Sequence, residues 1–107
     1  MYNMIYSTDG IEILQTDEFA KWLGRLNDPE ARARINIRIR RISLTGNFGD
    51  VKPVGDGVNE MRIDYGPGYR VYYAQRGSRT ILLLCGGVKA TQRADIAKSK
   101  RINSIYE

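Results

Sequence analysis

Two tight-turn signals divide residues 59–85 into three short segments, each with the character of a β-strand. Asn59–Tyr65 alternates apolar and polar side chains, and the cluster Gly66-Pro67-Gly68 follows it. Tyr69–Gln75 alternates again before the turn at Arg76-Gly77-Ser78. The run Thr80–Cys85 is apolar without a break, as in a strand covered on both faces. The sequence therefore predicts an antiparallel meander on which the rest of the chain must pack.

The segments on either side of the meander supply further strands and helices. Ile11–Gln15 alternates and predicts a first strand. Val51–Val54 predicts an edge strand, because Pro53 has no N–H to donate to a central ladder. Thr91 is placed to cap a last helix that runs to about residue 104. Thr16 can cap an earlier helix, which begins with two acids and has an apolar stripe of Phe19, Trp22, Leu23 and Leu26.

Residues 29–45 fit two kinds of element. The isoleucines at positions 35, 37 and 39 alternate with polar residues, as in a strand. Asp28-Pro29-Glu30, however, is a strong helix start, with a capping side chain, a proline in the first turn and an acid after it. Positions 35, 39 and 42 also share one helical face, and Gly46 supplies a stop. We predict a helix over 29–45, with a second, basic stripe of Arg34, Arg38 and Arg41.

Together these elements predict a single α+β domain over residues 1–107. Its N-terminal strand and helical hairpin pack on a mainly antiparallel meander sheet, and a helix follows at the C-terminus. No apolar run approaches the roughly 20 residues needed to span a bilayer, and the first residues lack the basic and apolar segments of a signal peptide. The single cysteine, Cys85, is expected to be a buried thiol of a cytoplasmic protein.

The net charge of +5 is unevenly distributed. Residues 21–41 carry seven lysines and arginines against two acids, and residues 89–101 carry five against Asp95. Basic clusters of this kind attract phosphate backbones, but they also occur on solvated helix faces and on docking surfaces for acidic proteins. The chain has no histidine and no clustered carboxylates, so we expect neither a metal nor another cofactor.

The first hairpin of the meander places a set of polar side chains on one face of the sheet. We expect this face to be open, because the alternate side chains should face the helices. Arginine forks onto phosphate oxygens and tyrosine stacks on bases, so such a face suits nucleic acid. The alternative is a solvated face with cross-strand pairs Glu60–Arg62 and Asp64–Arg70. The set comprises Glu60, Arg62, Asp64, Arg70 and Tyr72, with Lys89 and Arg93 beside it just past the last strand.

The hairpin NEMRIDYGPGYRVYYAQ, the strand ILLLCGG and the following VKATQRADIAK, preceded by two helices, resemble toxins of the RelE/ParE superfamily. Within it they are similar to the phage-related, HigB-like branch of addiction module killer proteins, over nearly the whole chain. Such proteins are mostly ribosome-dependent endoribonucleases that cut mRNA, whereas the ParE branch inhibits DNA gyrase. The resemblance implies a RelE/ParE-like α+β fold and a co-expressed antitoxin, often a helix-turn-helix DNA-binding protein.

The resemblance also implies roles for individual residues. In the nuclease branch one cation follows the hairpin tyrosine and another follows the last strand, which here are Arg70 and Lys89. Arg62 matches a basic position on the preceding strand, but Glu60 stands where a lysine is often found. Several relatives also use a histidine near the end of the sheet or a tyrosine early in the last helix. This chain has no histidine, and the tyrosine position falls near Asp95.

For RNA cleavage by the 2′-hydroxyl, these residues predict a site dominated by positive charge. Arg70, Arg62 and Lys89 would stabilise the phosphorane, an effect of about 10²–10³-fold for one preorganised donor. Glu60 is the candidate base, and Lys89 or Tyr72 is the candidate proton donor, because an exposed lysine stays charged at neutral pH. The candidate substrate-binding residues are Tyr72, Arg93, Arg34, Arg38 and Arg41.

The sequence leaves three functions open. The first is an mRNA interferase acting on ribosomes, whose RNA would attract the basic helix 29–45. The second is a ParE-like gyrase inhibitor without an active site, which the missing histidine and Glu60 favour. The third is a toxin-like fold kept as a non-toxic binding module. In each case we expect no membrane association and an antitoxin that covers the Arg62/Arg70 face or displaces the last helix.

Overall fold

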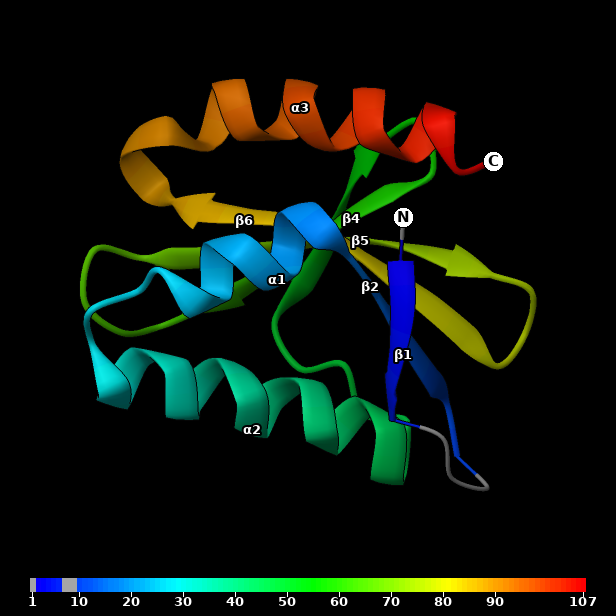
Figure 1. Ribbon diagram of the computed structural model, residues 1–107, viewed down its shortest axis with the longest axis horizontal. Helices are drawn as coiled ribbons and strands as arrows, with labels where there is room; N and C mark the ends of the chain where they lie inside the picture. Colours follow the sequence, from blue (N-terminus) through cyan, green and yellow to red (C-terminus); the bar gives the residue numbers. More distant parts are fainter. Residues whose placement is uncertain (1, 7–9) are drawn as a thin grey trace.

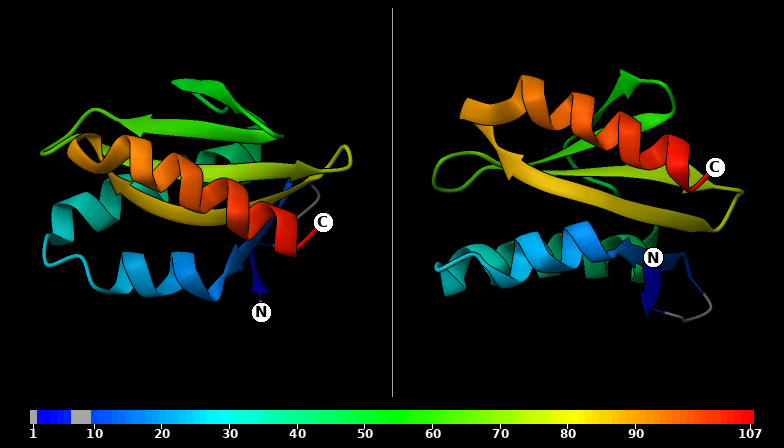
Figure 2. Two further views of the ribbon diagram at one scale, coloured as in Figure 1. Left: turned by 90° about the horizontal axis from the view of Figure 1, so that it is seen from above. Right: turned by 45° about the horizontal axis from the view of Figure 1, so that its top comes forward.

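The computed structural model describes residues 2–6 and 10–107, which are arranged in three layers (Figures 1 and 2). Within this part of the chain, six strands form one sheet in the order β1-β2-β6-β5-β4-β3. Helices α1 (Asp17–Gly24) and α2 (Pro29–Thr45) lie on one face of the sheet, and α3 (Gln92–Ile105) lies across the other. No helix in the described ranges has the length and apolar character needed to cross a membrane. The predicted α+β class is confirmed.

The sheet is a meander with two strands added from the N-terminus. The strands from β3 to β6 pair antiparallel in chain order, β2 joins β6 in parallel, and β1 pairs antiparallel with β2. The edge strand and the three meander strands are confirmed. β1 was not predicted, because it is five residues long and its side chains are mostly exposed. The strands are β1 (Tyr2–Tyr6), β2 (Glu12–Thr16), β3 (Val51–Gly55), β4 (Val58–Ile63), β5 (Tyr69–Arg76) and β6 (Thr80–Val88).

The helix predicted over 29–45 is confirmed as α2, and its ends show why helix is favoured over strand. The Asp28 carboxylate accepts hydrogen bonds from the backbone N–H groups of Glu30 and Ala31, at 3.0 and 3.2 Å. Gly46 closes the other end in a left-handed conformation with a φ of 72°. The face turned toward the sheet consists of Ala31, Ile35, Ile39, Ile42 and Ser43.

The side of the sheet under α1 and α2 carries the larger core. Met61 and Ile63 of β4 face this side with Val71 and Tyr73 of β5, as the alternation predicts. The apolar run in β6 is covered on both faces, which confirms a further expectation. Its side chains alternate between the two cores, with Ile81 and Leu83 on the α1/α2 side and Leu82 and Leu84 on the α3 side.

The opposite face is not open, contrary to the expectation from alternation. Ile96 and Ile102 of α3 pack on a buried cluster that includes Tyr72. The physical reason is that one half of this face is apolar, through Val58, Ala74, Leu82 and Leu84, and needs a cover. The cations gather at the other end of the face, near the turn at 66–68.

The starts of α1 and α3 differ in how a threonine is used. The hydroxyl of Thr16 accepts a hydrogen bond from the N–H of Phe19 at 3.0 Å, which confirms the cap predicted for α1. Before α3 lies a short 3₁₀ turn, η1 (Lys89–Thr91). Thr91 occupies the N-cap position of α3, but its hydroxyl makes no capping bond and lies 2.5 Å from Oδ2 of Asp95. The side-chain cap predicted for α3 is therefore wrong, because the hydroxyl bonds to the Asp95 carboxylate and to the backbone of Val88 instead.

Candidate functional site

A hollow of about 300 Å³ lies where β4 ends and β5 begins, beside the turn at 66–68. The strand register brings cations there, because Arg62 and Arg70 are direct partners on the two strands. The turn also approaches the chain after β6, where the N–H of Lys89 donates to the carbonyl of Pro67 at 3.3 Å. Three predicted site residues thus meet at one place. The lining consists of Asp50, Arg62, Ile63, Asp64, Gly68, Arg70 and Lys89.

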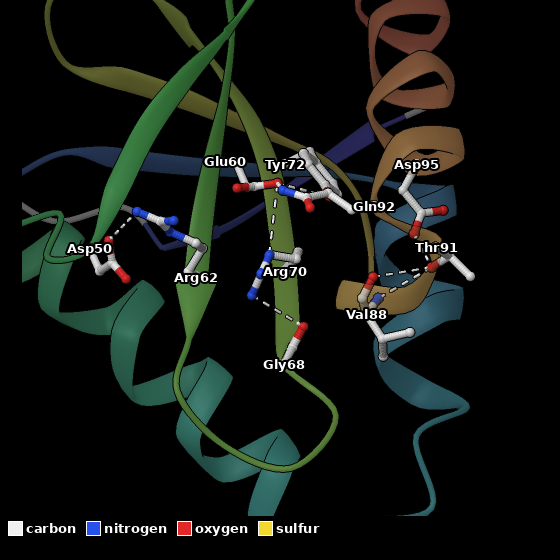
Figure 3. Close-up of polar contacts among 10 residues, drawn as sticks. All are labelled: Asp50, Glu60, Arg62, Gly68, Arg70, Tyr72, Val88, Thr91, Gln92 and Asp95. Carbon is white, nitrogen blue, oxygen red and sulfur yellow. Dashed lines mark hydrogen bonds and ion pairs between the residues drawn. The ribbon is translucent and has the colours of Figure 1, made fainter.

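Arg70 is more enclosed than Arg62, with a side chain that is 10% exposed against 36%. Its Nε lies 3.8 Å from Oε2 of Glu60, and its Nη1 donates to the carbonyl of Gly68 at 3.3 Å (Figure 3). The Nε side of the Arg70 guanidinium is therefore held by the ion pair with the buried Glu60, while the Arg70 side chain also lines the hollow.

Glu60 lies next to Arg70 but has no exposed surface. Its Oε2 accepts hydrogen bonds from the hydroxyl of Tyr72 at 3.2 Å and from Nε2 of Gln92 at 2.7 Å (Figure 3). Burial, and then the adjacent Glu60 carboxylate, raise the pKa of Tyr72, so its phenol remains a donor. Glu60 and Tyr72 are both 0% exposed, so neither side chain lines the hollow in this structure.

Arg62 is paired on the other side of the hollow. Its Nη2 donates to Oδ1 of Asp50 at 3.0 Å, and its backbone N–H donates to the carbonyl of Asp50 at 2.9 Å. The ion pairs thus differ from those considered from the sequence, since Arg62 pairs with Asp50 and Arg70 pairs with Glu60. The register explains the difference, because it sets the two arginines opposite each other rather than opposite acids.

A second groove, of about 450 Å³, runs between α2 and the end of β4. It shares Ile63 and Asp64 with the hollow, so the two depressions adjoin. Arg38 of the basic stripe donates to the carbonyls of Arg62 and Phe48 at 2.6 and 3.1 Å. Its partial burial lowers its pKa, and its contacts make it a support for the hollow's wall. The groove is lined by Glu30, Arg34, Ile37, Arg38, Arg41, Ile63 and Asp64.

The other predicted substrate-binding cations are on the surface. Arg34 and Arg41 are exposed on α2, and Arg34 pairs with Glu30 at 3.0 Å. The Arg34 guanidinium also lies 4.6 Å from the ring centroid of Tyr65, a cation–π distance. Arg93 is exposed in the first turn of α3 and is not one of the residues that line the hollow or the groove.

Sequence reasoning missed Gln92 and Asp50, which contact predicted site residues. Gln92 lies 32 positions from Glu60 in the chain, so no local pattern connects them. Asp50 sits in the loop before β3, and its carboxylate meets Arg62 only through the pairing of β3 with β4. A signal for the cover over Glu60 was nevertheless present, because Val58 and Ala74 share its face with Tyr72.

The fold and the hollow define a small α+β domain with a cationic surface site built on a β-hairpin. Residues 21–107 match the family described as "Phage derived protein Gp49-like", and the chain belongs to this family. The match includes every residue of the hollow. An uncharacterized protein of Haemophilus influenzae is 49% identical over 90 residues, which cover 84% of this chain and 90% of that protein.

Proposed function

We propose that this protein is the toxin of a toxin–antitoxin pair and acts as a ribosome-dependent mRNA endoribonuclease. The observation that carries the proposal is the convergence of Arg62, Arg70 and Lys89 on one hollow. Membership of a phage-derived family and the resemblance to HigB-like toxins support the same reading. Arginine and lysine at such a site suit a phosphodiester, whose oxygens accept charge-assisted hydrogen bonds.

The proposed reaction is a displacement at phosphorus within the RNA chain. The 2′-oxygen loses its proton and bonds to the adjacent phosphorus, and the bond from phosphorus to the 5′-oxygen breaks. The products are a 2′,3′-cyclic phosphate and a 5′-hydroxyl, whose oxygen takes up a proton. The phosphorane between them carries additional negative charge, which the three cations stabilise.

In the proposed reaction, the protons are transferred by side chains that line the hollow. Glu60, the base expected from the sequence, is enclosed, whereas Asp64 is exposed and lines the hollow. In the proposed reaction Asp64 takes the proton of the 2′-hydroxyl, and Lys89, exposed at the rim, gives one to the 5′-oxygen. Tyr72 takes no part, because it is enclosed and its pKa is raised.

The proposed partners follow from the same surface. The exposed cations Arg34 and Arg41 of α2 line the groove beside the hollow, where they would bind the phosphates of ribosomal or messenger RNA in the cytoplasm. A co-expressed antitoxin, of the helix-turn-helix type that the resemblance implies, would silence the toxin by covering the hollow.

A second candidate function, inhibition of DNA gyrase without nuclease activity, is favoured by one observation. Two of the three acid–base groups expected from the sequence, Glu60 and Tyr72, are enclosed. A protein of this kind would arrest growth and leave transcripts intact.

Induced expression without an antitoxin, followed by 5′-end mapping of cellular transcripts, tests the proposal. New cuts inside translated reading frames are expected. Growth arrest with intact transcripts would favour gyrase as the target. The absence of any arrest would indicate a non-toxic binding module.

Arg70→Lys is the informative variant for the site. Arg70→Ala would leave the buried Glu60 charge without its cation, and breaking a buried pair costs about 3–5 kcal/mol, so lost folding would confuse the result. Arg70→Lys keeps a cation and removes the guanidinium fork. We expect Arg70→Lys to give the circular dichroism spectrum of the folded wild type. Its rate of transcript cleavage should be about 10²-fold lower. Arg101→Ala, a change at an exposed site on α3, should cut as the wild type does; wild-type cutting by Arg70→Lys would contradict the assignment.

A further inference from the structure

We infer that Glu60 and Gln92 form a positioning pair that fixes the orientation of Arg70, an inference that rests on the proposed nuclease function. A carboxylate with no exposed surface is costly unless it is paired and hydrogen-bonded. Glu60 meets both conditions through contacts from β5 and from α3, and the cation among them is a residue of the hollow.

The contacts select one oxygen of the Glu60 carboxylate. Oε2 accepts from Tyr72 at 3.2 Å and from Gln92 at 2.7 Å, and it lies 3.8 Å from Nε of Arg70. Oε1 is buried and has no hydrogen-bond partner within the described residues. A quarter turn of the carboxylate would therefore lose both hydrogen bonds and move the charge away from Arg70, whereas a half turn only exchanges the two equivalent oxygens. The arrangement in Figure 3 keeps Oε2 turned toward the arginine.

The consequence for Arg70 is a restricted side chain. An ion pair at 3.8 Å keeps Nε beside Glu60, although Nε makes no hydrogen bond within the described residues, and Nη1 donates to the carbonyl of Gly68, so two contacts restrict the guanidinium. A donor that is already oriented needs no reorganisation when negative charge develops in the transition state. Arg62 lacks this restraint, because its partner Asp50 is exposed.

Gln92 extends the same restraint to α3. Gln92 is the first residue of this helix, and its side-chain amide donates to the buried carboxylate of Glu60. Gln92 is not one of the residues that line the hollow, so its effect on cleavage would pass through Glu60 and Arg70. If Glu60 acted as a base, removing the Gln92 amide would leave that base in place. The two roles therefore predict different behaviour for Gln92 variants.

The test compares Glu60→Gln, Gln92→Ala and Glu18→Gln in single-turnover cleavage of mRNA on programmed ribosomes. Glu18→Gln is the matched control, because it neutralises an exposed carboxylate that pairs with Lys98 of α3 at 3.0 Å, away from the hollow. Glu60→Gln should lower the rate at saturating toxin by roughly 10- to 100-fold, since a misplaced catalytic group can cost about that much. Gln92→Ala should lower it by a smaller factor, and Glu18→Gln should not. The half-saturating toxin concentration should stay the same throughout.

A second readout follows the arginine itself. The Nε–H of Arg70 in ¹⁵N-labelled protein should be protected from solvent exchange in the wild type and in Glu18→Gln. It should exchange faster in Glu60→Gln and in Gln92→Ala, measured at a temperature at which each variant is folded by circular dichroism. This measurement reports the orientation of Arg70, which a purely structural role of Glu60 would not alter in a folded variant.

The outcomes separate this inference from the proposed function. If the wild type cleaves mRNA and a folded Glu60→Gln protein cleaves it at the same rate, the positioning role is overturned and the nuclease proposal stands. If Glu60→Gln fails to fold, Gln92→Ala decides: an unchanged rate and an unchanged Arg70 signal would overturn the inference. A changed half-saturating concentration would show a role in RNA binding instead. Absence of cleavage by the wild type would remove both proposals together.

Discussion

Gly86 and Gly87 of β6 allow the outer layers to approach the sheet from opposite sides. A Cβ on Gly86 would lie 2.2 Å from the ring of Trp22 in α1, and a Cβ on Gly87 would lie 1.9 Å from Oδ2 of Asp95 in α3. Both distances are well below any contact that a real side chain makes. The two glycines therefore set how closely α1 and α3 sit on the central part of the molecule.

The Gly86→Ala substitution is expected to destabilise the protein by about 1–3 kcal/mol, the usual cost of overpacking a core. The Trp22 ring contacts the rings of Phe19 and Tyr69, so moving it away from an added methyl would disturb both contacts. Urea denaturation measures the change in the free energy of unfolding. In Trp22→Ala the added methyl meets no ring, so Gly86→Ala should cost much less in that background. An equal cost in both backgrounds would show that Trp22 is not the obstacle.

Among the elements, α2 is the one whose ends are best specified by the sequence. Asp28 and Gly46 both act as predicted, through the side-chain cap and the left-handed terminal residue. Helix α1 ends at Gly24, which has no atom within 4 Å of an added Cβ, as is also true of Gly46. The two glycines thus differ in backbone conformation and not in available space.

That difference gives a prediction with opposite signs. Gly46→Ala should destabilise the protein by about 1 kcal/mol, because a side chain is strained at a φ of 72°. Gly24→Ala should stabilise it by roughly 0.5 kcal/mol, because alanine restricts the unfolded chain and favours helix. Thermal and urea denaturation of the two single variants provide the comparison. Destabilisation of similar size in both would mean that backbone conformation does not control these positions.

The sequence predicted elements better than it predicted what covers them. Local signals were sufficient for α2 and for the alternation of β4 and β5, because caps and a period of two depend on near neighbours. The enclosure of Glu60 and Tyr72 depends on which face α3 packs against; Val58 and Ala74 mark that face as partly apolar, but they do not show which element covers it. The convergence of Arg62, Arg70 and Lys89 was predictable because a hairpin and its next strand must lie side by side. The hydrogen bond from Gln92 to Glu60 was not predictable, because no local pattern connects the two residues.

On the scale of the whole molecule, helices cover both faces of the sheet, and β5 places a buried tyrosine on each face. Tyr73 stacks on Phe48 with ring centroids 5.6 Å apart on the α2 side. Burial raises the pKa of Tyr73 to about 12, although Arg38 acts in the opposite direction. Burial likewise raises the pKa of Tyr72 on the α3 side.

These shifts predict alkaline unfolding. A tyrosine whose pKa is higher in the folded state contributes stability that is complete below the unfolded pKa of about 10 and is lost as pH rises toward the folded value. Each such group adds a slope of about 1.4 kcal/mol per pH unit in that window. For Tyr73 the window runs from pH 10 to about 12. Urea midpoints measured between pH 8 and pH 11.5 should fall less steeply in Tyr73→Phe than in the wild type; parallel curves would contradict the assignment.

The parallel pairing of β2 with β6 has a consequence for synthesis. Glu12 lies opposite Thr80, so β2 leaves the ribosome long before the strand it needs. Helices α1 and α2 also emerge before the sheet that they cover, with their apolar faces unburied. The hollow is lined by residues from Asp50 to Lys89, and Gln92 contacts the buried Glu60 beside it. The hollow is therefore incomplete until translation is almost finished, and a chain truncated before Gln92 would lack the contact that holds Glu60 in place.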